Sequence, residues 1–255
     1  ALAFTLWPTA LAALLLGTLG WWWHGRRILS GRLMVFGLVA GAFGHALPML
    51  AAYWLATRAG AGFASLSFTL TPVLTLAIMA LLGRERLQPV RLLAVALGLA
   101  GGVLLVGGQV WSQQRELHLM AVALLVPALI AATNVYRGLA MPRGVPDAWL
   151  SAATLGGSTG VLLALVPLVD PQALAAPSAS GLTWLGAQTA ALVSGYLCYF
   201  GLQRRAEPVA FSLIGYVMLV VSLALASLAL RRRTALITQP LQWLTRAADD
   251  ISRLG

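Results

Sequence analysis

Long apolar stretches alternate with short polar segments along the whole chain. We assign eight apolar spans: residues 1–22, 33–56, 62–82, 89–108, 118–136, 148–168, 181–202 and 208–230. About 20 apolar residues in a helix cross the roughly 30 Å hydrocarbon layer of a bilayer. Because lipid offers no hydrogen-bond partner to the backbone, these spans are predicted to be helices. The pattern predicts an all-α fold, a polytopic membrane bundle of about eight transmembrane helices.

The positive charges gather in alternate loops. Ten arginines follow the odd-numbered spans: Arg26, Arg27, Arg32, Arg84, Arg86, Arg91, Arg137, Arg143, Arg204 and Arg205. The even-numbered spans up to the sixth are followed only by Arg58 and Arg115. Since arginine marks the cytoplasmic side, residue 1 is expected outside. Three arginines at 231–233 follow the eighth span. Eight crossings from an outside start would place them outside, which opposes the assignment of arginine to the cytoplasmic side.

Composition narrows the class of protein further. Hydrophobic residues make up 60% and charged residues 9% of the 255 residues, against about 25% charged in soluble domains. The net charge of +10 comes from loop arginines, which specify topology, so a nucleic-acid-binding face is excluded. The absence of lysine and the abundance of Ala, Leu and Gly suggest a bacterial source, and hence the bacterial inner membrane. The single Cys198 excludes an intramolecular disulfide framework.

Small residues recur at four-residue spacing in several spans. The sets are Gly37/Gly41, Ala94/Gly98/Gly102 and Ala152/Gly156/Gly160. Such stripes let helix backbones approach closely in lipid, so a tightly packed bundle is expected.

Two parts of the chain resemble each other weakly. Residues 53–66 and 199–213 share an aromatic pair, a following arginine and a Phe/Ala/Ser/Leu group, at an offset of about 147 residues. The loop charges give the two copies opposite orientation. Inverted repeats of this kind place a substrate path at their interface near the bilayer midplane.

Residues 33–108 resemble the EamA repeat of the drug/metabolite transporter superfamily. The motifs are Ala-Tyr-Trp-Leu-Ala at 52–56, Ala-Ser-Leu at 64–66, Thr-Pro-Val-Leu at 71–74, Leu-Gly-Arg-Glu-Arg-Leu at 82–87 and a glycine-rich group at 96–102. A weaker second copy includes residues 132–134 and 211–217. The resemblance implies ten helices in two inverted repeats, and the transport of small metabolites, amino acids or drugs, mostly outward.

This resemblance suggests three parts. Residues 1–110 form a first EamA-like repeat that lacks the first family helix, and residues 111–230 form a second repeat that lacks the last. Residues 231–255 carry apolar positions at alternating spacings of four and three, which predicts an amphipathic helix. This tail resembles the start of a HAMP linker, the relay helix of membrane sensors. An interfacial helix lying on the membrane is the alternative.

The chemistry-bearing residues within the spans are few. No enzyme motif is visible, and we expect no catalytic residue, cofactor or metal site. His45 lies deep in the second span, where it either carries a proton or bonds a neighbouring helix. Asn134 either binds substrate or joins helices. Pro72 is expected to kink the third span, with Thr69 and Thr71 beside it.

Two tyrosines complete the predicted substrate pathway. Tyr196 and Tyr216 lie deep enough in their spans to line a path, although interfacial anchoring is the commoner role of tyrosine. The sequence therefore favours a secondary transporter that exports a small metabolite or drug-like solute by alternating access. The alternative is a sensory module coupled to a HAMP-type relay. Expected partners are a small-molecule substrate and membrane lipid, with a homodimer left open.

Overall fold

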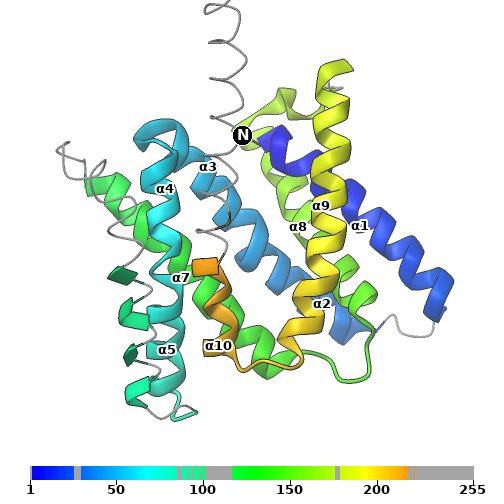
Figure 1. Cartoon of the computed structure of the whole chain (residues 1–255). Coiled ribbons are helices and arrows are strands. Elements are labelled where there is room, and N and C mark those ends of the chain that lie inside the picture. Colours follow the sequence, from blue (N-terminus) through cyan, green and yellow to red (C-terminus); the bar gives the residue numbers. More distant parts are fainter. Residues whose placement is uncertain are drawn as a thin grey trace, which may run out of the picture. The chain divides into compact units, whose positions relative to one another are not determined.

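The structure is a computed structural model that describes residues 2–25, 30–84, 88–90, 92–93, 95–97, 99–100, 117–175, 179–217 and 221. Its regular elements are all helices, with no strand among the described residues, so the predicted all-α class is confirmed (Figure 1). The elements are α1 (Leu2–His24), α2 (Gly31–Gly41), η1 (Ala42–Ala46), α3 (Leu47–Ala59), α4 (Ala61–Phe68), α5 (Thr71–Leu81), α7 (Leu117–Ala140), α8 (Asp147–Val169), η2 (Pro171–Leu174), α9 (Ala179–Gln203) and α10 (Pro208–Ser212).

Among the described residues, four helical segments are long and apolar enough to cross a membrane. They are Leu2–His24, Gly31–Ala59, Leu117–Ala140 and Asp147–Val169, with mean hydropathy between 1.8 and 2.0. They correspond to the predicted spans 1–22, 33–56, 118–136 and 148–168. The predicted span 181–202 is the 25-residue helix α9. The predicted spans 89–108 and 208–230 fall largely outside the described residues, so the count of eight stays a prediction.

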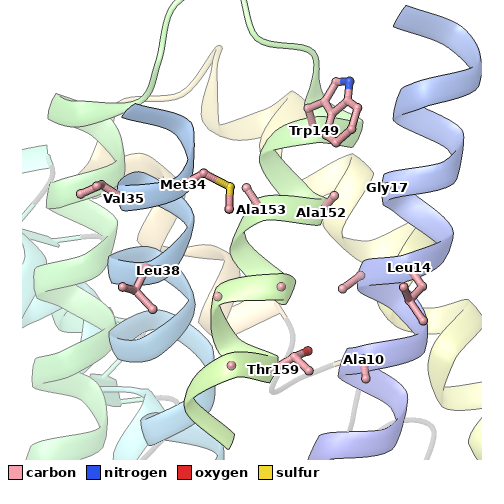
Figure 2. Close-up of a pocket in the computed structure, with 14 residues that line it drawn as sticks. Ala10, Leu14, Gly17, Met34, Val35, Leu38, Trp149, Ala152, Ala153 and Thr159 are labelled. Carbon is pink, nitrogen blue, oxygen red and sulfur yellow. The ribbon is translucent and has the colours of Figure 1, made fainter. Parts of the chain in front are cut away.

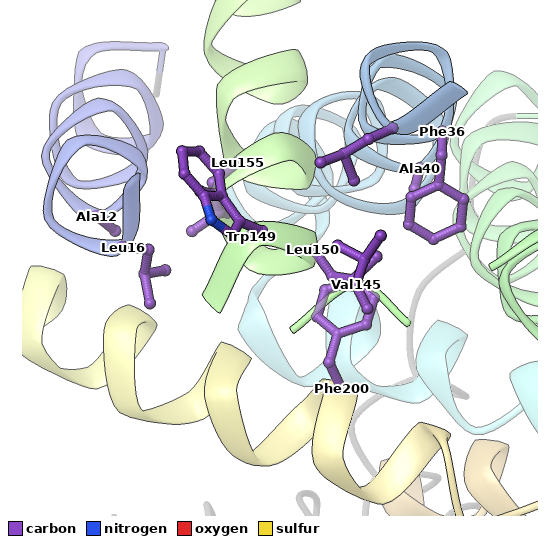
Figure 3. Close-up of a cluster of buried hydrophobic side chains, with 11 residues drawn as sticks. Ala12, Leu16, Phe36, Ala40, Val145, Trp149, Leu150, Leu155 and Phe200 are labelled. Atoms are coloured by element: carbon purple, nitrogen blue, oxygen red, sulfur yellow. The ribbon is translucent and has the colours of Figure 1, made fainter. Parts of the chain in front are cut away.

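Helix α8 lies at the centre of the packing around the two N-terminal helices, α1 and α2. It packs along α1 on one side and α2 on the other, and α9 packs against both α1 and α8. Figure 3 shows the apolar cluster that these four helices enclose, including Leu16, Phe36, Leu155 and Phe200. The rings of Phe36 and Phe200 lie 6.4 Å apart between centroids. On the other side of the bundle, α7 packs against α3, α4 and α5.

The glycines of α2 let its backbone touch that of α8. A Cβ atom on Gly41 would overlap the backbone carbonyl oxygen of Thr154 and the amide nitrogen of Ser158. A Cβ atom on Gly37 would lie 2.7 Å from the Cβ of Ala153. The predicted role of the Gly37/Gly41 stripe in close packing is therefore supported.

The stripe predicted on α8 is displaced. The residue that meets α2 is Gly157, where an added Cβ would lie 2.6 Å from the Cα of Leu38. Gly156 and Gly160 have open space around them and do not touch a neighbouring helix. The predicted face was wrong at these two positions because spacing alone does not say which side of a helix its partner occupies. Residues 94, 98 and 102 lie outside the described residues.

The predicted span 62–82 is a broken helix. Helix α4 ends at Phe68, residues 69 and 70 form a turn, and α5 begins at Thr71. Pro72 lies in the first turn of α5 rather than in the middle of a helix. Proline fits this position because its missing N–H has no partner in a first turn. The expected kink at Pro72 is thus a complete interruption, placed just before it.

The chain divides into two compact units, Ala1–Gly215 and Tyr216–Gly255. The predicted HAMP-like tail at 231–255 and the arginines at 231–233 lie outside the described residues. The boundaries of the predicted repeats at residues 110 and 230, and their inverted relation, stay predictions.

Candidate functional site

A short π-helical segment interrupts the membrane-spanning helix Gly31–Ala59. This segment, η1, covers Ala42–Ala46 and holds His45. A π-helical turn inside an α-helix shifts the side chains that follow and often marks a functional site. Only 8% of His45 is exposed. The segment therefore presents an ionisable group to the interior of the bundle.

His45 contacts α1 through Thr9. Its Nε2 atom lies 3.2 Å from the Thr9 Oγ1 atom. The Thr9 hydroxyl donates its hydrogen to the Thr5 carbonyl oxygen at 2.6 Å. Because that hydrogen is already committed, Nε2 of His45 acts as the donor to Oγ1. In neutral imidazole this leaves Nδ1 as an acceptor.

Two tyrosines of α9 continue the cluster away from His45. The Tyr196 ring meets the imidazole edge-to-face, with centroids 5.7 Å apart, and stacks on Tyr199 at the same centroid distance. Tyr199 packs edge-to-face on Phe211 of α10 at 4.5 Å. The Ser151 hydroxyl donates to the Tyr196 carbonyl oxygen and ties α8 to α9. The rings thus form a continuous row from η1 to α10.

Asn134 and Arg137 of α7 complete a buried polar network. The Tyr199 hydroxyl donates to Oδ1 of Asn134 at 3.1 Å and accepts a hydrogen bond from Nη1 of Arg137. Nη2 of Arg137 donates to the Ala40 carbonyl oxygen at 3.0 Å. Asn134 and Arg137 are only 3% and 2% exposed. We call Thr9, His45, Asn134, Arg137, Tyr196 and Tyr199 the polar network.

Arg137 was expected to be a loop charge, and that prediction was wrong. Arg137 belongs to α7 and is buried, whereas Arg143 lies in an exposed turn. The available signal was its spacing from Thr133 and Asn134, which puts all three on one face of a helix. A face that stays polar through the last turn indicates a polar neighbour inside the bundle.

The other predicted pathway residues lie elsewhere. The break between α4 and α5 holds Thr69, Thr71 and Pro72, all of which are buried. Both α4 and α5 pack on α7. The Thr71 Oγ1 atom is buried and has no hydrogen-bond partner among the residues described. Tyr216 belongs to the second compact unit and is half-buried there. The network therefore brings together His45, Asn134 and Tyr196 from the predicted set, and the hydrogen bonds and ring contacts described for it include none of the other four.

An apolar groove lies outside this network, between α1 and α2 over the surface of α8 (Figure 2). It has a volume of about 710 Å³, and its lining is almost entirely apolar, including Leu14, Met34, Leu38 and Gly160. Its one hydroxyl, on Thr159, already donates to the Leu155 carbonyl oxygen. Trp149 also lines the groove, and its indole Nε1 atom is buried without a hydrogen-bond partner among the described residues. The groove therefore offers few polar groups to recognise a polar solute.

Two smaller cavities are also apart from the network. One, of about 540 Å³, lies beside the ion pair between Arg204 and Asp147, and the other, of about 370 Å³, is lined by Trp7 and Trp184. None of the three cavities is lined by a predicted pathway residue. Among the residues that the structure describes, no three His, Cys, Asp or Glu side chains gather as metal ligands.

The Tyr199 hydroxyl holds the network together, so we expect Tyr199→Phe to destabilise the bundle by about 1–3 kcal/mol. The ring would still pack on Phe211, but Asn134 Oδ1 and Arg137 Nη1 would each lose a buried partner. Thermal unfolding of the detergent-purified protein measures the change. Tyr136→Phe is the matched control, because Tyr136 is partly exposed and no described hydrogen bond uses its hydroxyl. Equal unfolding midpoints for the two variants would contradict the expectation.

The comparison with protein families agrees with a helical membrane protein. Residues 1–107 match the model of the EamA-like transporter family. No curated protein matches the chain. The match ends before α7, so the predicted second repeat stays a prediction. EamA-like proteins are membrane transporters rather than enzymes, and the apolar helices of this chain fit a multi-pass membrane protein. Residues 1–107 are therefore similar to the EamA-like transporter family, and this match is consistent with an EamA-type membrane transporter of the drug/metabolite superfamily.

Proposed function

We propose that the protein is a secondary transporter that exports a small metabolite or drug-like solute across the bacterial inner membrane by alternating access. The observation that carries the proposal is the polar network inside an otherwise apolar bundle. Ionisable side chains within a membrane are costly to bury and are found mainly where they handle substrate or protons. His45 and Arg137 are both buried in this network.

The network joins helices from separate parts of the chain. His45 and Ala40 come from the span Gly31–Ala59, Thr9 from α1, and Asn134 with Arg137 from α7. Tyr196 and Tyr199 come from α9. A solute that replaces some of these hydrogen bonds would change how the helices hold together. This supports a site at which binding shifts the balance between two arrangements of the helices.

Efflux from vesicles tests the proposal directly. The intact protein would be reconstituted in liposomes and loaded with a panel of labelled amino acids, organic acids and cationic dyes. We expect one class of solute to leave faster than from protein-free liposomes. Asn134→Ala is expected to slow this efflux, whereas Cys198→Ala, which alters an exposed position on α9, should not. If no solute in the panel moves, or if the two variants behave alike, the proposal fails.

His45 is expected to couple transport to protons. An imidazole ring can bind and release a proton, and its surroundings set the pH at which it does so. Its neighbours are Thr9 of α1, Tyr196 of α9 and, beside Gly44, Arg137 of α7. If His45 carries the coupled proton, efflux by the unmodified protein should vary with pH, and efflux by His45→Ala should not. His24→Ala, at an exposed position, is the control; a pH profile that His45→Ala leaves unchanged would exclude the coupling role.

A further inference from the structure

Among the residues that the structure describes, the buried cation Arg137 has no acidic partner. Its described contacts are Tyr199, the Ala40 carbonyl oxygen and two aromatic rings, at 5.1 Å from the Tyr199 centroid and 5.9 Å from that of Phe200. Its Nε atom is buried and has no hydrogen-bond partner in the described part of the chain. Aromatic faces compensate part of the cost of burying a positive charge. They do not neutralise it, so the site retains an unbalanced positive charge.

The guanidinium lies well inside the bundle. The side chain of a helical residue leans toward the N-terminal end of its helix, so Arg137 extends from the last turn of α7 back toward the middle. Its partner Ala40 is ten residues into the span Gly31–Ala59, about 14 Å along the axis at 1.5 Å per residue. That depth is near the midplane, where transporters of inverted-repeat type bind their substrates. The charge therefore does not lie at the membrane surface.

Gly44 makes room for the guanidinium. A Cβ atom there would lie 2.5 Å from Nη2 of Arg137 and 2.6 Å from Cγ2 of Thr133. The arginine thus lies directly against the backbone of η1, next to His45. The π-helical segment and the buried charge are parts of one site.

The polar groups of the site that have no described hydrogen-bond partner are donors. Asn134 accepts from Tyr199 through Oδ1, and this leaves the N–H groups of its Nδ2 without a described partner. Arg137 retains its Nε–H and further N–H hydrogens. Asn134 and Arg137 are three residues apart, so they share a face of α7. A set of donors around one positive charge is complementary to an anion.

We propose that Arg137 and Asn134 bind the carboxylate group of the transported solute, an inference that rests on the proposed function. One unbalanced positive charge matches one negative charge. The planar guanidinium presents two parallel N–H donors, which fit the two oxygens of a carboxylate. The rings of Tyr196 and Tyr199 contact the rest of the solute. The alternative is that Arg137 only joins α2, α7 and α9. That role does not account for its buried Nε–H, which has no described hydrogen-bond partner.

Ligand-dependent stability of the purified protein tests the site. The probes are benzoate and N-acetylglycine, each compared with its neutral amide, benzamide or N-acetylglycinamide, at constant ionic strength. Well above its dissociation constant, a carboxylate should raise the unfolding midpoint by about 2–4 °C. The matching amide should not. Inorganic phosphate is the third arm, and a larger shift with phosphate than with either carboxylate would overturn the assignment to carboxylates.

Variants show whether Arg137 is responsible. Arg137→Met should remove the shift, and Arg143→Met, the same substitution in an exposed turn, should keep it. Arg137→Lys retains the charge and tests the geometry of the donors separately from the charge. It should reduce the shift because the paired donors are lost. A full shift in Arg137→Lys or Arg137→Met, or no difference between carboxylates and amides, would overturn the proposal.

Efflux measured on the same variants separates the two proposals. If neutral solutes are exported equally by the unmodified protein and Arg137→Met, and no carboxylate shifts the midpoint, the transport function stands and the carboxylate site fails. If carboxylates shift the midpoint through Arg137 but no solute is exported, the binding site stands and the transport proposal fails.

Discussion

Gly41→Leu is expected to abolish the folded bundle. Even the first carbon of the new side chain would overlap two backbone atoms of α8, at Thr154 and Ser158. Backbone atoms cannot move aside as a flexible side chain can, so α2 and α8 must separate. Overpacking a tight interior typically costs about 1–3 kcal/mol and occasionally more. A clash against helix backbone belongs at the upper end, and size-exclusion chromatography in detergent should show loss of the monodisperse protein.

Gly160→Leu is the matched control for this prediction. Gly160 lies on α8 with open space around it, so the same substitution should leave the chromatographic profile and the unfolding midpoint near those of the unmodified protein. Gly41→Ala should fall between the two, because it adds only the overlapping carbon. A monodisperse Gly41→Leu protein with an unchanged midpoint would contradict the close packing of α2 on α8.

Arg137→Met should remove transport while raising thermal stability. Methionine fills much of the same volume without a charge, and an arginine at the centre of a membrane helix costs about 2.5–3.5 kcal/mol on insertion scales. Removing this cost should outweigh the loss of the hydrogen bonds to Tyr199 and Ala40. Efflux should fall at least about tenfold, since losing one partner of a buried, hydrogen-bonded charge pair costs about 2–5 kcal/mol.

The two readouts distinguish a binding role from a structural one. If Arg137 mainly joins helices, Arg137→Met should lower the unfolding midpoint, and efflux should fall only as the folded fraction falls. Arg143→Met is the control in both measurements, because Arg143 is exposed. A stable but inactive Arg137→Met protein fits a residue kept for function at a cost in stability.

Parts of the site were visible in the sequence because they are unusual in a membrane span. His45, Asn134 and Tyr196 were singled out as polar groups at positions where lipid would exclude them. The structure buries His45 and Asn134 and places Tyr196 against the imidazole ring. Polarity within an apolar run was thus a usable signal, even though it did not say which residues meet.

Arg137 was missed for a physical reason. Arginines close to a helix end usually extend to the membrane surface, and the loop rule counts them as topology signals. Whether such a side chain turns outward or inward depends on what the neighbouring helices offer. Here Tyr199 of α9 and the carbonyl oxygen of Ala40 lie within reach, and Gly44 leaves the space. None of these partners is near Arg137 in the sequence.

Hydropathy by itself established that this chain is a helical membrane protein, because burying apolar residues in lipid and satisfying the backbone depend only on local composition. The glycine spacing of α2 likewise indicated a close helix contact. Which face of α8 receives that contact, where the third predicted span breaks and which way Arg137 points were decided only in the folded bundle. These features depend on atoms contributed by helices that are distant in sequence, and no local pattern records their positions.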